Sequence, residues 1–155
     1  MVCDCVYRAM HKIRCRCKEY TQDAQTAYTE GKFAEANALF MEAFEVAHSL
    51  LALPLVDNTS VNVLVNSGLN CLQFCQQPKQ RLLYLQTMVE TLQALFRSAE
   101  HESSVRFTAL DSCTYFTQLL AEELKSQNNW GEVQEVLNQF EANWSRYAPE
   151  LIQLN

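Results

Sequence analysis

The chain has 155 residues, which is enough for one domain to bury a hydrophobic core without disulfide bridges. Hydrophobic residues make up 48% of it, and with only three Gly and three Pro its runs of Leu, Ala, Glu and Gln predict an all-α protein. The formal charge of −6 argues against nucleic acid as a ligand, because phosphate binding requires clustered Lys and Arg.

The basic residues are concentrated near the start of the chain. Five of the 12 lie in residues 1–18, together with a single acidic residue. Such a segment could touch a membrane or nucleic acid, but charges of this kind usually form a solvated helix face, which is our interpretation here.

The chain shows no sign of a membrane span or an export signal. No apolar run approaches the ~18 residues that a span requires, and the opening residues lack the uninterrupted apolar segment and the cleavage site of a signal peptide. We therefore expect a cytoplasmic protein whose seven cysteines are reduced thiols.

The clearest pattern lies in residues 17–52, which predict two amphipathic helices joined by a turn at Gly31. Small side chains would let the helices approach closely, Gly31 would allow the positive φ of the turn, and aromatic side chains would fill the space between the helices. These small and aromatic positions are Ala24, Gly31, Phe33, Ala36, Phe40 and Ala43.

Their spacing resembles that of a tetratricopeptide repeat. The stretch departs from that family at Tyr20, where Trp is frequent, at Asp23, where Leu is usual, and at His48, where the closing Pro is common. The resemblance implies a fold of stacked helical hairpins and a role in binding other proteins.

Apolar residues at steps of three and four predict six helices along the chain. Their approximate ranges are 5–29, 33–53, 61–76, 78–98, 103–127 and 130–148. Pro149 is expected to end the last helix, leaving residues 150–155 as a short turn. Its apolar pattern is made of Val133, Val136, Leu137, Phe140, Trp144 and Tyr147.

Turns near residues 31, 77 and 129 arrange the six helices as three antiparallel hairpins. We therefore predict one all-α domain over residues 1–155, a tetratricopeptide-like bundle or short superhelix. An alternative for residues 1–14 is a poorly ordered or extraneous extension, with Met10 as an internal start.

Polar residues before three of the helices are candidate N-caps. Asn58, Thr59 or Ser60 would cap the third helix, and Ser103 or Ser104 the fifth. For the sixth helix, Asn129 followed three residues later by Glu132 has the spacing of a capping box.

Four cysteines form two Cys-x-Cys pairs, Cys3 with Cys5 and Cys15 with Cys17. Four thiolates could hold a zinc ion, so a metal-binding or redox-regulatory protein is the alternative function. Helical geometry opposes this, because residues two apart on a helix point about 200° from each other. We expect Cys17 to be buried and Cys15 to be exposed.

The third helix carries an unusual polar row made of Asn62, Asn66, Asn70 and Gln73. Asn is a poor helix former, so its repetition at helical spacing invites an explanation. Carboxamides both donate and accept, which suits contact with the backbone of an extended peptide. The alternative is a plain solvent-exposed stripe.

The resemblance also bears on this row, because the first helix of each tetratricopeptide pair lines the concave binding surface. The Lys and Asn clamp of the chaperone-tail-binding members is missing, since Thr21 and Gln25 stand at its positions. No phosphate-binding loop, nucleophile elbow or zinc-protease motif is present, so we expect neither an enzyme nor a cofactor. The leading hypothesis is a non-enzymatic scaffold for a protein or peptide partner, with the partner and the oligomeric state left open.

Overall fold

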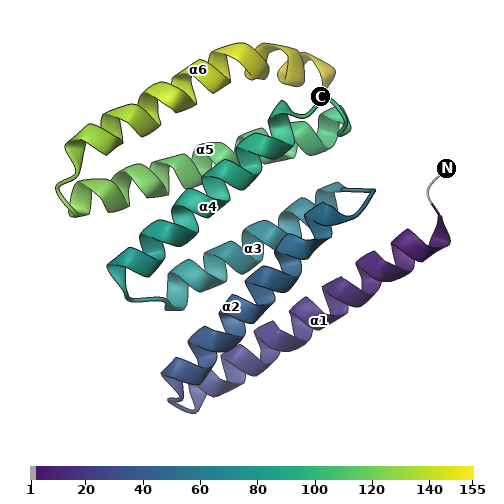
Figure 1. The fold of residues 1–155 in the computed structure, drawn as a ribbon, viewed down its shortest axis with the longest axis vertical. Coiled ribbons are helices and arrows are strands. Elements are labelled where there is room, and N and C mark those ends of the chain that lie inside the picture. The colour runs from purple at the N-terminus through teal and green to yellow at the C-terminus, as the bar shows by residue number, and fades with distance from the viewer. Residues whose placement is uncertain (1–2) are drawn as a thin grey trace. The chain divides into compact units, whose positions relative to one another are not determined.

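The computed structural model describes residues 3–155, which form six α-helices and one short 3₁₀ helix (Figure 1). The elements are α1 (Asp4–Thr29), α2 (Phe33–Ser49), η1 (Leu50–Ala52), α3 (Asn58–Phe74), α4 (Pro78–Arg97), α5 (Ser103–Ser126) and α6 (Trp130–Leu154). No strand occurs in the described residues. The predicted all-α fold of antiparallel helical hairpins is confirmed.

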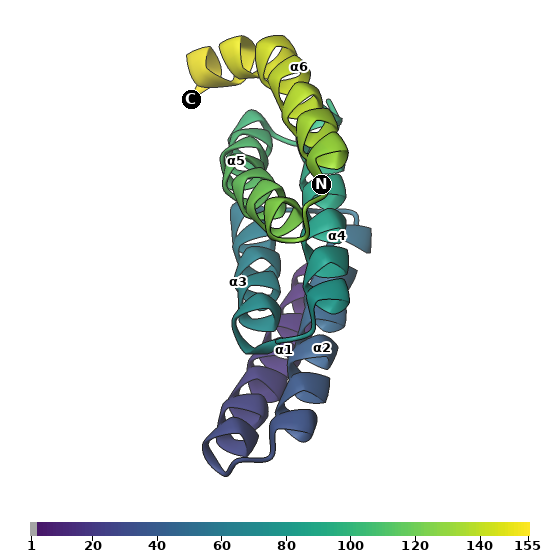
Figure 2. The same ribbon diagram turned by 90° about the vertical axis from the view of Figure 1, so that its left-hand side faces the viewer.

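The chain divides into two compact units, residues 1–75 with α1 to α3 and residues 76–155 with α4 to α6. Within the first unit α2 packs on both α1 and α3, and within the second unit α5 packs on both α4 and α6. Each unit is therefore organised around its middle helix. The two hairpins α1–α2 and α5–α6 can be followed in Figure 2.

The α1–α2 hairpin forms as the small residues predict. Gly31 has φ +77°, and the Lys32 N–H closes the turn on the Ala27 carbonyl at 2.9 Å. Ala24 and Ala36 are fully buried, so the two helices approach closely at these positions. Residues 4–14 are a regular part of α1, and Met10 is buried.

The expectation that Phe33 fills the space between these helices is wrong, because its side chain is 57% exposed. Phe33 is the first residue of α2, and side chains in a helix lean toward its N-terminus, so this ring packs over the turn against Tyr28 at 5.1 Å. Phe40 fills the interior instead. It is 1% exposed and stacks on Phe74 at 4.5 Å.

The third helix begins three residues earlier than predicted, and its cap is a different residue. Asp57 accepts a 2.8 Å hydrogen bond from the Ser60 N–H, so Asn58, Thr59 and Ser60 all lie inside α3. The carboxylate is held in place from outside the helix by Arg14 of α1. A contact between residues 43 positions apart decides this boundary.

In the second unit the predicted side-chain caps of α5 and α6 are absent. Glu102 and Asn129 occupy the N-cap positions, and neither makes a side-chain capping bond. The end of α4 is stabilised instead by Arg106, whose Nε donates a 2.9 Å hydrogen bond to the Phe96 carbonyl. This buried link supplies a partner to one of the last carbonyls of α4.

Pro149 does not end the last helix, which continues to Leu154. A proline removes one intrahelical hydrogen bond and displaces the preceding turn, so a helix can pass through it with a bend. The curved C-terminal part of α6 is visible in Figure 2. Leu151 is fully buried and its carbonyl accepts a 2.8 Å bond from Asn155 Nδ2, which stabilises the last turns.

Candidate binding surfaces

The carboxamide row of α3 lies on the side of the helix opposite its buried face. Asn62, Asn66 and Gln73 are exposed, and Asn70 is half-buried. The opposite face is packed into the protein through several buried side chains. These are Val61, Leu64, Ser67, Gly68, Cys71 and Leu72.

This arrangement brings the four predicted residues into one continuous line. From Asn62 to Gln73 the line extends about 17 Å along the helix axis, at 1.5 Å per residue. Because the buried face holds α3 in place, the carboxamides are presented from a rigid element. The row can offer several donors and acceptors to a ligand at once.

The structure does not bring the four N-terminal cysteines together. Cys3 and Cys5 lie at the start of α1, about 15 Å along the helix axis from Cys15. Cys17 is buried, as expected, and donates to the Ala43 carbonyl at 3.4 Å, whereas Cys15 is exposed. Residues 3–155 contain no group of three or more metal-ligating side chains. A site made of all four thiols would require α1 to unwind.

An ion pair between Arg14 and Asp57 joins α1 to the start of α3. Arg14 Nη2 lies 2.8 and 2.9 Å from the two carboxylate oxygens, and Asp57 also accepts from the Ser60 hydroxyl at 2.9 Å. Burial raises the pKa of Asp57, but the hydrogen bonds from Ser60 and Arg14 outweigh it, so the pKa lies below its ordinary value. This pair is a structural link between two helices.

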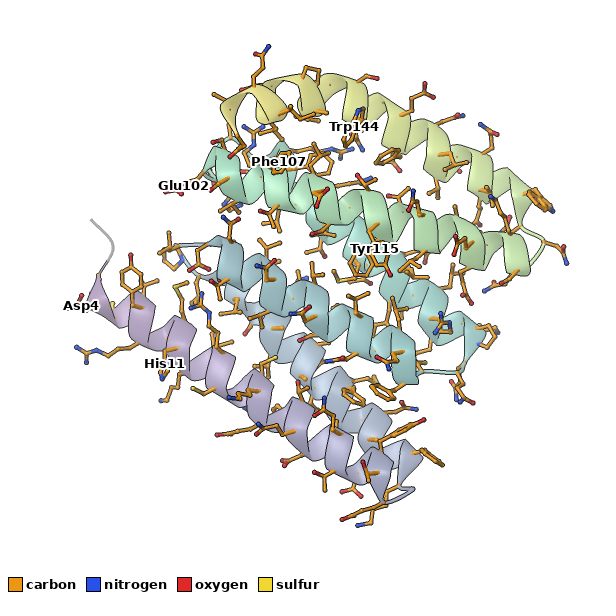
Figure 3. The ribbon with its side chains drawn as sticks, turned by 180° about the vertical axis from the view of Figure 1, so that it is seen from behind. Asp4, His11, Glu102, Phe107, Tyr115 and Trp144 are labelled. Atoms are coloured by element: carbon orange, nitrogen blue, oxygen red, sulfur yellow. The ribbon has the colours of Figure 1, made fainter. Side chains whose placement is uncertain are left out.

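Contrary to the prediction, Arg14 does not lie on a solvated basic face but makes this partly buried pair with Asp57. The chemical signal was an Asp three residues before a Ser at a helix start. The other basic residues of that segment, Arg8, Lys12, Arg16 and Lys18, are exposed. His11 and Asp4 lie with them on α1, as Figure 3 shows.

A cavity of about 310 Å³ lies within the second unit, between α4 and α6. Its apolar lining comes from Val89 of α4, Leu120 of α5 and Val136 of α6. It forms because α4 and α6 both pack on α5 and make little contact with each other. The sequence alone does not reveal this cavity, because its walls come from three separate helices.

The polar lining of this cavity is acidic. Glu90 of α4 and Glu132 and Glu135 of α6 contribute three carboxylates, and no Lys or Arg of the described chain lines it. Gln93 lines the cavity as well and is only 7% exposed. One helical turn beyond it, Arg97 Nη2 donates a 2.8 Å hydrogen bond to Asn143 and joins α4 to α6.

A comparison with protein families finds one match over most of the chain. The family model described as "Protein of unknown function (DUF2753)" matches residues 16–153, which include most of the first unit and nearly all of the second. The chain belongs to the DUF2753 family. No curated protein and no solved structure matches it.

The part of the DUF2753 chain described here has no helix that is both long and apolar enough to cross a membrane. Its last helix nevertheless carries exposed apolar side chains at a spacing of seven residues. Trp130 is 61% exposed, and Leu137 and Trp144 are each 39% exposed. Trp144 on α6 is labelled in Figure 3.

Two residues of the apolar pattern of this DUF2753 helix, Leu137 and Trp144, are therefore only partly covered. Within the unit α6 packs mainly on α5, so only one side of its broad apolar face is covered. Val133 is buried, and Tyr147 is half-buried and packs edge-on against Phe96 at 5.5 Å.

Proposed function

We propose that this DUF2753 chain is a non-enzymatic helical scaffold that binds a protein or peptide partner in the cytoplasm. The observation that supports the proposal is the carboxamide row of α3, formed by Asn62, Asn66, Asn70 and Gln73. Three of these side chains are exposed while the opposite face of the helix is buried. The resemblance of residues 17–52 to a tetratricopeptide repeat points to the same class of function.

The row suits an extended peptide in length and chemistry. Its length of about 17 Å corresponds to about five residues of extended chain at 3.3–3.4 Å per residue. An extended backbone presents N–H and C=O groups that carboxamides can bond whatever the side chains are. Each hydrogen bond of this kind contributes about 0.5–1.5 kcal/mol, so several together would support a moderate affinity.

The proposal can be tested by selecting phage-displayed random peptides on the intact protein. We expect selected peptides to bind the wild type and to lose at least about tenfold in affinity for the variant Asn62→Ala/Asn66→Ala/Asn70→Ala, since several hydrogen bonds disappear. The variant should fold normally, because Ala is a better helix former than Asn.

The matched control is Gln118→Ala/Gln134→Ala/Asn138→Ala, which removes three carboxamides, all of them exposed, from the second unit. It should bind the selected peptides as the wild type does. Peptides that bind the α3 variant and the wild type equally well would contradict the proposal. So would a strong loss of stability in the α3 variant, because the carboxamides would then serve the fold.

A further inference from the structure

We propose that two copies of this chain associate through the exposed apolar side of α6, with the two α6 helices antiparallel about a two-fold axis at Leu137. This side of the helix, the tryptophan stripe, consists of Trp130, Leu137 and Trp144. The partner is a second copy of the same chain, and both copies use the same surface. The tryptophan stripe lies in the second unit and is independent of the carboxamide row of α3.

The tryptophan stripe stays open because α6 uses a different side to pack within its own unit. The buried apolar residues of α6 are Val133, Ala148 and Leu151. Residues seven apart differ by only about 20° around a helix, so the three stripe residues share one side. They are 61%, 39% and 39% exposed in chain order, and the half-buried Phe140 extends the apolar surface at 5.9 Å from the Trp144 ring. A continuous apolar surface of this kind marks an interaction site.

The order of the residues makes the tryptophan stripe complementary to itself. Each Trp lies seven residues from Leu137, which is about 10.5 Å along the helix axis. When two α6 helices run antiparallel with Leu137 opposite the partner's Leu137, Trp130 of each copy meets Trp144 of the other. Two aromatic pairs then flank the central leucines, and aromatic pairs add to the stability gained from buried area alone.

The charges beside the tryptophan stripe also suit a second copy. Among the described residues of α6, Glu141 is the only charged one within about 60° of the stripe around the helix. In the antiparallel pair Glu141 lies opposite the partner's Gln134, whose amide can donate to the carboxylate. The carboxylates of Glu132, Glu135 and Glu150 lie on the far side of the helix, about 140° or more from the stripe. Like charges therefore do not meet, and a basic partner would find little charge to bind.

The area of the tryptophan stripe corresponds to a weak dimer. The exposed fractions of Trp130 and Trp144, 61% and 39%, together equal one complete Trp side chain, or about 250 Å². Leu137 and the polar side chains beside the stripe add to this area. A stable complex buries about 800 Å² per partner, so we expect a dimer with a dissociation constant of roughly 100 μM.

The test begins with the full chain at concentrations from about 5 to 500 μM, because dimerisation depends on protein concentration. Sedimentation velocity should show the mass rising from 17.8 kDa toward twice that value. The chain has only two Trp residues, and both belong to the tryptophan stripe. Their fluorescence, recorded in front-face geometry, should therefore shift to shorter wavelength over the same concentration range as the rings leave water.

Substitutions of Leu137 test the two-fold arrangement. Leu137→Asp and Leu137→Lys each place like charges opposite one another, so each variant should associate at least about tenfold more weakly than the wild type. An equimolar mixture of the two variants should dimerise again, because opposite charges then face each other. The matched control is Leu83→Asp, which makes the same change at a leucine of α4 that is 57% exposed. This control should associate within about twofold of the wild type.

A wild-type chain that remains monomeric to about 500 μM, with unchanged Trp fluorescence, would overturn the proposal. Equal losses in Leu137→Asp and Leu83→Asp would do so too. A mixture that stays monomeric would show that Leu137 does not face its own copy, which also contradicts the proposal. The wild-type measurements decide the matter even if the variants do not fold. The variant Asn62→Ala/Asn66→Ala/Asn70→Ala should dimerise normally, so failure of the peptide-binding proposal would be seen separately.

Discussion

Arg97 donates a hydrogen bond from Nη2 to Oδ1 of Asn143 at 2.8 Å, which joins the outer helices α4 and α6 of the second unit. Asn143 is only 8% exposed, and its Nδ2 is buried without a partner. In the first unit Arg14 and Asp57 make a comparable link between α1 and α3. In both units an arginine on the first helix donates a hydrogen bond to a polar side chain at or near the third helix. The two helices joined in this way both pack on the middle helix of their unit.

The Arg97–Asn143 link predicts opposite effects for its two partners. Arg97→Ala should destabilise the protein by about 1–3 kcal/mol, the cost of leaving the buried Asn143 oxygen without a donor. Asn143→Leu should be close to neutral or stabilising, because it removes both the bonded oxygen and the unpaired Nδ2 and adds apolar surface in the same place. Urea unfolding followed by circular dichroism measures both; equal losses would show that the bond has no special role.

The cap of α3 predicts a pH dependence of stability. The pKa of Asp57 is lowered in the folded protein, so its contribution is complete above the unfolded pKa of about 3.9 and is lost as the pH falls through the folded value. Asp57→Ala should therefore cost about 0.5–2 kcal/mol at pH 7, and the difference from wild type should shrink below about pH 4. Urea titrations at pH 7, 5, 4 and 3 test this, and a difference that is constant over this range would contradict it.

Two phenylalanines of α2 form a matched pair for testing the core. Phe40→Ala should cost about 3–5 kcal/mol, because the ring is buried and stacks on Phe74. Phe33→Ala should cost less than about 1 kcal/mol, because the ring is largely exposed. Thermal and urea unfolding of the two variants gives the comparison, and similar losses would place Phe33 in the core.

The cysteines should differ in their rate of alkylation. The hydrogen bonds of Cys5 with Cys3 lower the pKa of the exposed Cys3 thiol, so more of it is thiolate at pH 7. Burial raises the pKa of Cys113 to about 11. Iodoacetamide at pH 7 followed by peptide mass spectrometry should find Cys3 modified early and Cys113 last. In urea the difference in alkylation rate between Cys3 and Cys113 should disappear. A difference that persists in urea would show that local sequence, and not the fold, causes it.

The alternative function, a metal-binding site made of Cys3, Cys5, Cys15 and Cys17, requires a different measurement. Metal analysis of the purified protein provides the direct test. Stoichiometric metal that is lost in Cys15→Ser/Cys17→Ser would favour the cysteine site over the peptide-binding scaffold. Because Cys17 is bonded to the core through Ala43, such a site would also require α1 to rearrange.

The sequence by itself determined the helices, because the spacing of apolar residues at three and four positions is a local property that each segment carries. The turn at Gly31, the helix start at Pro78 and the burial of Cys17 all followed from local rules, and so did the exposure of Asn62 and Asn66 opposite an apolar face. These features depend on backbone conformation and on which face of a helix is apolar.

Only the tertiary structure decided which neighbouring helices cover the apolar face of each helix and which polar side chains form hydrogen bonds with one another. Asp57 caps α3 because Arg14 reaches it from another helix, and Trp144 is partly exposed because α6 packs mainly on α5. The cavity beside Gln93 exists only where α4 and α6 lie over α5. Each of these depends on contacts between segments distant in the chain, and a helical period carries no information about which distant segment will be the neighbour.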